Sequence, residues 1–324
     1  MLNWRREFEK RFLKRGWAMS GKFKFTLLFL LLSTVAFSHS NQWIQIQSRL
    51  TGEELKASVV LPPGYEEDAR RYPVLYFLHG WESSPFNLQL LLDWGELLAE
   101  LCAQGKASPF IIVIPESGDA GRSWYSDYTD GRAYEGYLIK ELIPFIDRNF
   151  RTIPTPKGRG IAGFSMGGFG AFKLIAKYPH LFGSASSVSG ILSLETLTFG
   201  WKLTPLRLFS NTFRHLSEEV FGLTVEDWQR NDPKTLLVRL AENLPQVYAQ
   251  RSFFVVVGNK DEFFCHKHAE ELVAFFSETG ADYVYLKVPG GRHNFFFLRS
   301  CLDEVFQFHS EKFTAISPML EEAS

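Results

Sequence analysis

The sequence predicts an α/β domain with a mostly parallel central sheet, helices on both faces of the sheet and a small helical cap-like insertion. Three observations support this prediction. Short apolar runs rich in β-branched residues alternate with segments that carry apolar residues at helical spacing. One of these runs ends in a glycine-flanked serine, and a largely aromatic and aliphatic stretch interrupts the alternation later in the chain. Alternating strands and helices are typical of a parallel sheet that is covered on both sides.

The composition is that of an ordinary globular protein. The chain has 324 residues, of which 45% are hydrophobic and 22% are charged, so it can bury a sizeable core. The 35 Lys and Arg residues nearly balance the 36 Asp and Glu residues, and we therefore expect no nucleic-acid partner. The 31 phenylalanines are unusually many, and we expect some of them to line an apolar pocket.

The N-terminal part of the chain has the features of a signal peptide. Lys22 and Lys24 precede an apolar block, Phe25–Phe37, and the small residues Ala36 and Ser38 follow the pattern of a cleavage site after Ser38. The block is shorter than the roughly 20 apolar residues that a membrane span needs. We therefore assign residues 1–38 to an N-terminal extension and signal peptide, and residues 39–324 to an exported catalytic domain.

Two alternatives stay open for this segment. The true start is Met1 or Met19, because the basic stretch before the apolar block is long for a signal peptide. An uncleaved block would instead act as a signal anchor, which would tether the exported domain to a membrane. That tether would be its only membrane contact.

The predicted strands begin with a pair. Gln42–Ser48 and Leu55–Leu61 alternate between polar and apolar residues and are expected to form an antiparallel ribbon. The later runs are more continuously apolar, as in strands buried on both faces. These strands are Val74–Leu78, Ile111–Ile114, Gly160–Gly163, Ser184–Val188, Phe253–Gly258 and Tyr283–Val288.

Three helices are predicted between these strands. Leu88–Leu101 and Tyr134–Asn149 carry apolar residues at helical spacing, and Pro144 predicts a kink in the second. Gly168–Tyr178 is the third helix. The stretch Ile191–Asp232 breaks the rhythm, and we interpret it as the cap-like insertion.

The residues Gly163-Phe164-Ser165-Met166-Gly167 follow the G-x-S-x-G pattern in its expected context. A predicted strand ends just before Ser165, and a predicted helix begins just after it. A strand–turn–helix with serine at the apex is the nucleophile elbow of α/β-hydrolases. The turn holds the serine in strained backbone geometry, and a side chain on either flanking glycine would clash. Ser165 is therefore the predicted nucleophile.

A serine hydroxyl needs a base to take its proton. In the α/β-hydrolase order an acid and then a histidine follow the serine. His293 lies in a glycine-rich loop just past the last predicted strand, where a parallel sheet presents catalytic groups. The other late histidine, His309, falls in a helical stretch, and we expect it at the surface.

The acid is expected after the strand that precedes the histidine loop. Asp261 stands in the loop Gly258-Asn259-Lys260-Asp261-Glu262, and its role would be to hold the imidazole tautomer. Glu262 and the more distant Asp232 are the competing carboxylates. For the oxyanion hole we expect the backbone N–H groups of Met166 and of Trp81. Gly80 would allow the substrate to approach closely.

No metal or cofactor is expected. His266 and His268 form an H-x-H pair without a third ligand pattern, and we place them at a solvated helix start. The three cysteines match no zinc spacing, and a Cys265–Cys301 disulfide stays open against two buried thiols.

These residues resemble the Putative esterase family, which includes S-formylglutathione hydrolase, tributyrin-type and feruloyl esterases, enterochelin esterases and mycolyltransferases. The resemblance spans roughly Leu55 to Phe297 in the family's order. The matching segments are VVLPPGY, YPVLYFLHG, SWYSD, YLIKELIPFIDRNF, IAGFSMGGFGAFKLIAKYPHLFGSASSVSG, GNKDE and PGGRHNF. It implies an α/β-hydrolase fold, a triad of Ser165, Asp261 and His293, and oxyanion donors at Trp81 and Met166.

The function expected from these features is a serine carboxylesterase that hydrolyses short-acyl or aryl esters through an acyl-enzyme on Ser165. Phe164 is expected beside the substrate, and Trp124 and Tyr125 are expected as exposed aromatics that shape the pocket rim or pack against the core. One alternative is an acyltransferase that moves the acyl group to a sugar or lipid alcohol. Another is a hydrolase-like scaffold that only binds its ligand.

Overall fold

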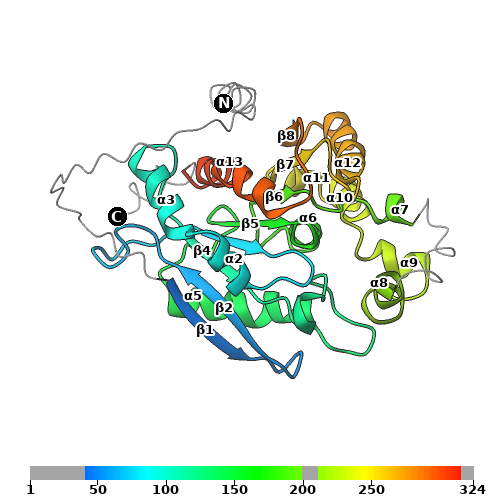
Figure 1. Cartoon of the computed structure of the whole chain (residues 1–324), viewed down its shortest axis with the longest axis horizontal. Helices are drawn as coiled ribbons and strands as arrows, with labels where there is room; N and C mark the ends of the chain where they lie inside the picture. The colour runs from blue at the N-terminus through cyan, green and yellow to red at the C-terminus, as the bar shows by residue number, and fades with distance from the viewer. Residues whose placement is uncertain (1–40, 199–210, 315–324) are drawn as a thin grey trace, which may run out of the picture. The chain divides into compact units, whose positions relative to one another are not determined.

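The computed structural model describes residues 41–198 and 211–314. An eight-stranded sheet runs in the order β1-β2-β4-β3-β5-β6-β7-β8 (Figure 1). The strands are β1 (Asn41–Gln47), β2 (Glu54–Val60), β3 (Val74–Leu78), β4 (Ile111–Pro115), β5 (Arg159–Phe164), β6 (Ser184–Val188), β7 (Ser252–Gly258) and β8 (Asp282–Val288). The β1–β2 and β2–β4 pairs are antiparallel and every other pair is parallel. Each predicted strand is therefore confirmed to within one residue at either end.

Helices cover both faces of this sheet. Phe253 in β7 packs against Phe172 of α6 (Met166–Lys177) and Phe276 of α12 (Cys265–Thr279). The next residue, Phe254, packs against Phe308 of α13 (Phe295–Thr314). Because successive strand residues point to opposite faces, α6 and α12 lie on one face and α13 on the other. Helix α3 (Trp94–Ala103) lies on the same face as α13, because its Trp94 contacts Phe306 of α13.

Two predicted helices are subdivided in the structure. The segment predicted as one helix over Leu88–Leu101 forms α2 (Pro85–Leu91) and α3, because Asp93 caps a new helix by accepting from the Glu96 N–H. The segment around Pro144 forms α4 (Tyr134–Gly136), the π-helical turn η2 (Tyr137–Leu142) and α5 (Ile143–Asn149). A π turn shifts the hydrogen-bond register by one residue, and here it precedes the proline that lacks a donor.

The insertion between β6 and β7 is largely helical in its described part. It contains α7 (Leu194–Leu197), α8 (Asn211–His215), η4 (Leu216–Val220) and α9 (Val225–Gln229). Next come α10 (Pro233–Asn243) and α11 (Pro245–Tyr248), which lead into β7. Residues 199–210 of the insertion and the predicted signal segment 1–38 lie outside the described residues. Within the described ranges, no helix is long and apolar enough to cross a membrane.

The structure decides two points that the sequence left open or predicted otherwise, the Cys265–Cys301 disulfide and the position of His309. Cys102, Cys265 and Cys301 are all free thiols, so no Cys265–Cys301 disulfide forms. The surface position expected for His309 is wrong, because its ring is fully buried between α13 and β6. Its Nδ1 lies 2.8 Å from the Ser184 hydroxyl and its Nε2 lies 2.7 Å from the Ser186 hydroxyl. The two serines point to the same face of β6 and satisfy both ring nitrogens.

We expect this buried histidine to make the fold sensitive to acid. Burial lowers the pKa of His309 to about 3, whereas a histidine in an unfolded chain titrates near ~6.5. The unfolded state therefore binds the proton first, so the stability contribution is complete above about pH 6.5 and is lost as the pH falls toward 3. The free energy of unfolding should decrease by up to about 1.4 kcal/mol per pH unit from this group.

Urea unfolding at a series of pH values from about 7.5 down to 5 measures this slope. His309→Gln should reduce the slope by about one proton, while the exposed His180 provides a control in His180→Gln. An unchanged slope in His309→Gln would contradict the assignment.

Candidate active site

Ser165 stands at the apex of a tight turn between β5 and α6. Its backbone has φ 55° and ψ −118°, a conformation that is strained for any residue with a side chain. Its N–H donates to the Val188 carbonyl at 2.9 Å, which anchors the turn to the neighbouring strand β6. A Cβ on Gly163 would overlap the Gly167 backbone, and one on Gly167 would overlap the Leu78 carbonyl. The predicted strand–turn–helix geometry is therefore present.

Three side chains predicted from the sequence meet above the carboxyl ends of β5, β7 and β8. The Ser165 hydroxyl lies 2.9 Å from His293 Nε2, and His293 Nδ1 lies 2.9 Å from Asp261 Oδ2. The Asp261 side chain is fully buried and the His293 side chain is 10% exposed. A serine, an imidazole and a carboxylate in this chain of hydrogen bonds can activate the hydroxyl as a nucleophile.

The surroundings of Asp261 favour its charged form. Burial alone would raise the pKa of this carboxyl, but hydrogen bonding and charge from His293, a hydroxyl contribution from Ser189 and the Phe263 N–H lower it below its ordinary value. The Phe263 N–H donates to Asp261 Oδ1 at 3.0 Å. These contacts favour the ionised carboxylate, as an orienting group beside the imidazole requires.

The two competing carboxylates do not contact the imidazole ring. Glu262 accepts the backbone N–H of His293 at 2.9 Å and the Arg292 side chain at 2.6 Å, so it holds the loop and not the ring. Asp232 is buried at the start of α10, where it accepts the N–H groups of Thr235 and Leu194. Both carboxylates already have backbone partners.

The turn His79-Gly80-Trp81 is held rigidly beside the elbow. The Gly80 carbonyl accepts from His79 Nδ1 at 2.8 Å and from the Ser83 N–H at 3.2 Å. The peptide bond is trans, so the Trp81 N–H of the same peptide unit points away from these partners. Among the described residues neither the Trp81 N–H nor the Met166 N–H has a hydrogen-bond acceptor. Two backbone donors are thus left free next to Ser165.

An apolar cavity of about 340 Å³ opens at Ser165 and His293. Trp81, Trp124 and Met166 form one part of its wall. The other residues come from the insertion and from the loop after β7, and they are Ile191, Leu197, Thr212, Phe213, Leu216 and Phe263. Apart from the general expectation that the insertion covers the site, the sequence did not point to these residues, because their pattern is that of ordinary helix faces.

The aromatic residues predicted beside the substrate have different positions. Trp124 is buried and lines the cavity. Tyr125 is also buried, not exposed, and its hydroxyl donates to the His79 carbonyl at 3.1 Å. Phe164 packs against the His293 ring at a centroid distance of 5.0 Å. A Cβ on Gly80 would come within 3.3 Å of Phe164, so glycine permits the close approach of the turn to the elbow.

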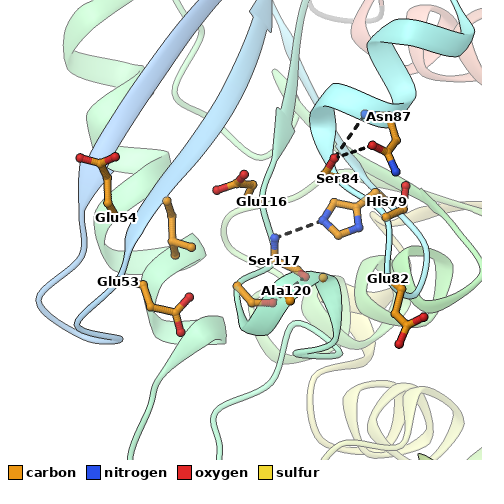
Figure 2. Close-up of a pocket in the computed structure, with 13 residues that line it drawn as sticks. Glu53, Glu54, His79, Glu82, Ser84, Asn87, Glu116, Ser117 and Ala120 are labelled. Atoms are coloured by element: carbon orange, nitrogen blue, oxygen red, sulfur yellow. Dashed lines mark hydrogen bonds between the residues drawn. The ribbon is translucent and has the colours of Figure 1, made fainter.

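A second, polar hollow of about 290 Å³ lies behind the His79 turn (Figure 2). His79 Nε2 accepts the Ser117 N–H at 3.2 Å across it, and burial lowers the pKa of His79 to about 4. The neutral imidazole therefore bridges the turn to the end of β4. The carboxylates of Glu53, Glu54, Glu82 and Glu116 surround this hollow, and Ser165 does not line it.

The H-x-H pair lies at the start of α12 as predicted, but His268 is not solvated. His268 is buried, and its Nδ1 donates to the Ser193 carbonyl at 2.8 Å, which joins α12 to the start of the insertion. His266 is only partly buried.

Comparison with known proteins is consistent with this geometry. Residues 48–296 match the family described as Putative esterase. The chain belongs to this family. Esterase Rv1288 of Mycobacterium tuberculosis is 35% identical over 225 residues, which are 68% of this chain and 46% of that protein. The chain thus spans about half the length of this curated relative.

Two further relatives are feruloyl esterases by name. The endo-1,4-beta-xylanase/feruloyl esterase of Xylanibacter ruminicola is 35% identical over 160 residues, which are 47% of this chain and 22% of that protein. The solved structure of a ferulic acid esterase superposes with a TM-score of 0.71 at 23% identity, covering 86% of this chain and all of that one. The likeness to that structure confirms the predicted α/β-hydrolase fold.

Proposed function

We propose that this family member is a serine carboxylesterase that acts through Ser165, His293 and Asp261. The observation that carries the proposal is the continuous hydrogen-bond chain from the Ser165 hydroxyl through both nitrogens of His293 to Asp261. In the proposed reaction the Ser165 oxygen attacks the ester carbonyl carbon, and its proton moves to His293 Nε2. Asp261 keeps the Nδ1 proton in place and stabilises the imidazolium.

The remaining steps use the same imidazole, first as an acid and then again as a base. The free N–H groups of Met166 and Trp81 would donate hydrogen bonds to the carbonyl oxygen as negative charge develops on it. His293 Nε2–H then protonates the leaving alcohol, and the acyl group stays on Ser165. A water molecule that gives its proton to His293 releases the acid and restores the hydroxyl.

The orientation of the Trp81 peptide should depend on His79. Phenylalanine at this position would fill the buried space but could not donate to the Gly80 carbonyl or accept the Ser117 N–H. We expect His79→Phe to lower kcat by roughly 10- to 100-fold with a small change in KM, because removing an oxyanion donor outright costs about 10²–10³-fold. Steady-state kinetics with a soluble ester measure both constants. A change confined to KM would contradict a role in positioning the oxyanion donor.

The size of the cavity supports short-acyl or aryl esters as substrates. A volume of about 340 Å³ is near the lower limit of typical ligand pockets. Phe213 and Leu216 of the insertion line it together with Ser165 and Met166 of the elbow. We expect kcat/KM for p-nitrophenyl esters to peak at about four carbons or fewer, because each further methylene gains about 0.8 kcal/mol only where it finds apolar space.

Variants of the cavity wall make this experiment sharper. Leu216→Ala should move the optimum to a longer acyl chain, while Leu223→Ala, on the exposed surface of the same insertion, should leave it in place. A monotonic rise of kcat/KM to ten or more carbons in the unaltered protein would refute the short-acyl proposal. Adding a low concentration of an alcohol to the same assay distinguishes hydrolysis from acyl transfer, since a transferase would form mainly the ester of that alcohol whereas a hydrolase would release mainly the acid.

A further inference from the structure

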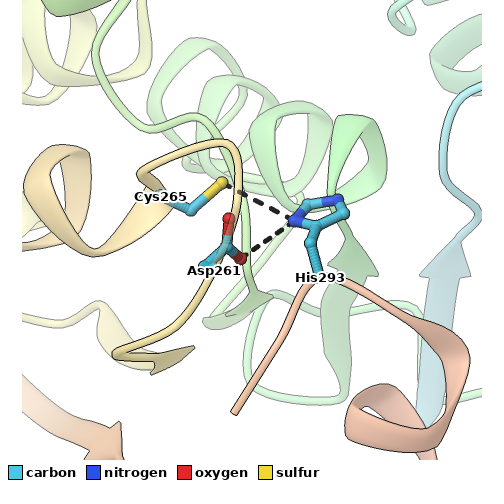
Figure 3. A group of neighbouring side chains, drawn as sticks. All are labelled: Asp261, Cys265 and His293. Atoms are coloured by element: carbon cyan, nitrogen blue, oxygen red, sulfur yellow. Dashed lines mark hydrogen bonds and ion pairs between the residues drawn. The ribbon is translucent and has the colours of Figure 1, made fainter. Parts of the chain in front are cut away.

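A buried thiol lies directly against the proposed acid–base pair. Cys265 is the first residue of α12, and its Sγ lies 3.8 Å from His293 Nδ1 (Figure 3). The same Nδ1 lies 2.9 Å from Asp261 Oδ2. One ligand atom from each of the three residues falls within 4.8 Å of the others, and among the described residues this is the only such group of three or more His, Cys, Asp or Glu side chains.

These three groups form a ligand set for a thiophilic divalent cation. Zinc binds thiolate sulfur at about 2.3 Å, imidazole nitrogen at about 2.0–2.1 Å and carboxylate oxygen at about 2.0–2.2 Å. Tetrahedral geometry with these bonds separates the ligand atoms by roughly 3.3–3.6 Å. The distances of 2.9 Å and 3.8 Å lie on either side of that range. Shifts of about half an ångström would bring these two pairs into that range, and the third pair, Cys265 Sγ and the Asp261 oxygen, is separated by at most 4.8 Å.

The charges of the set also suit a buried divalent ion. A thiolate at Cys265 and a carboxylate at Asp261 together neutralise two positive charges, and the His293 ring remains neutral. A neutral cluster avoids the large cost of burying an uncompensated charge. The exposed segment Glu262–Phe264 joins the two buried ligands Asp261 and Cys265, and its Phe263 ring lies 4.7 Å from the His293 ring. We expect an ion to enter by displacement of this segment.

We propose that Asp261, Cys265 and His293 form an inhibitory site for Zn²⁺ or a similar thiophilic cation. The ion takes the place of the proton on His293 Nδ1, and water completes its coordination. The Cys265 thiol proton leaves to solvent. The imidazole keeps one proton, which now resides on Nε2, and Nε2–H can no longer accept the Ser165 proton. Inhibition in this form rests on the proposed function, whereas metal binding does not.

The binding test uses the full chain carrying Ser165→Ala, which lacks the proposed nucleophile but retains all three ligands. Titration with Co²⁺ should produce one equivalent of bound metal and a thiolate-to-cobalt absorption band. Cys265→Ser and Cys265→Ala in this background should abolish the band. Cys301→Ser is the matched control, because Cys301 is equally buried and free in α13, and it should retain the band. Absence of the band with Cys265 present, or its persistence without Cys265, would overturn the site.

The inhibition test uses the protein with Ser165 in place. Zn²⁺ should inhibit ester hydrolysis, and a chelator should restore the rate. With each variant normalised to its own metal-free rate, Cys265→Ser should need at least about tenfold more Zn²⁺ for half inhibition, a difference of about 1.4 kcal/mol. Equal zinc sensitivity in the Cys265→Ser and Cys301→Ser proteins would refute inhibition through this cluster. A cobalt band in a protein without esterase activity would instead retain the site and reject the proposed function.

Discussion

Ser165→Ala is expected to reduce ester hydrolysis by a factor on the order of 10⁶ in kcat, the loss typical of removing the nucleophile of a serine hydrolase. The hydroxyl that lies 2.9 Å from His293 Nε2 would be gone, and no acyl-enzyme could form. Any residual rate would come from binding and from the oxyanion donors. Steady-state hydrolysis of a p-nitrophenyl ester measures the loss, and labelling by a fluorophosphonate probe should disappear with it.

Ser187→Ala is the matched control for this experiment. Ser187 is a buried serine in the adjacent strand β6, and its hydroxyl has no hydrogen-bond partner among the described residues. Its removal should change kcat by less than about threefold, since its hydroxyl makes no hydrogen bond to Ser165, His293 or Asp261. If the Ser165→Ala protein kept a tenth of the original rate, or kept its fluorophosphonate labelling, Ser165 would not be the nucleophile.

Asp261→Asn is expected to lower kcat by about 10⁴-fold, as in the worked serine–histidine–aspartate example. The amide can present its N–H₂ group to His293 Nδ1, which favours the tautomer that carries its proton on Nε2. That tautomer cannot accept the proton of Ser165. The measurement is kcat for a soluble short-chain ester, with circular dichroism to establish that the protein is folded.

The two competing carboxylates test whether this effect is specific to Asp261. Glu262→Gln should reduce the rate by much less, because Glu262 contacts the His293 backbone and Arg292 and not the ring. Asp232→Asn should also lower kcat only slightly. It should lower the stability of the fold, because one of the two backbone N–H groups that donate to Asp232 would lose its acceptor. Equally small effects at Asp261, Glu262 and Asp232 would reassign the acid to another group.

The sheet and the candidate catalytic residues could be predicted from local pattern because their signals are local. Strands buried on both faces are continuous apolar runs, and the tight elbow needs glycine at positions 163 and 167, so both features are written in consecutive residues. The chain order of serine, acid and histidine, together with the position of each loop after a strand, also follows from sequence alone. The distances of 2.9 Å among these groups did not follow from it.

Other features were decided only by contacts between segments far apart in the chain. His309 has the pattern of a helix surface, yet Ser184 and Ser186 satisfy its ring in the core. The cavity wall at Phe213 and Leu216 and the thiol of Cys265 beside His293 likewise depend on how whole helices pack. Periodicity indicates which face of a helix is apolar but not which residues of another element that face meets. The sequence by itself therefore determined the α/β architecture and the candidate catalytic residues. Only the tertiary structure decided the shape of the pocket, the burial of His309 and the neighbours of the imidazole, because long-range packing brings those groups together.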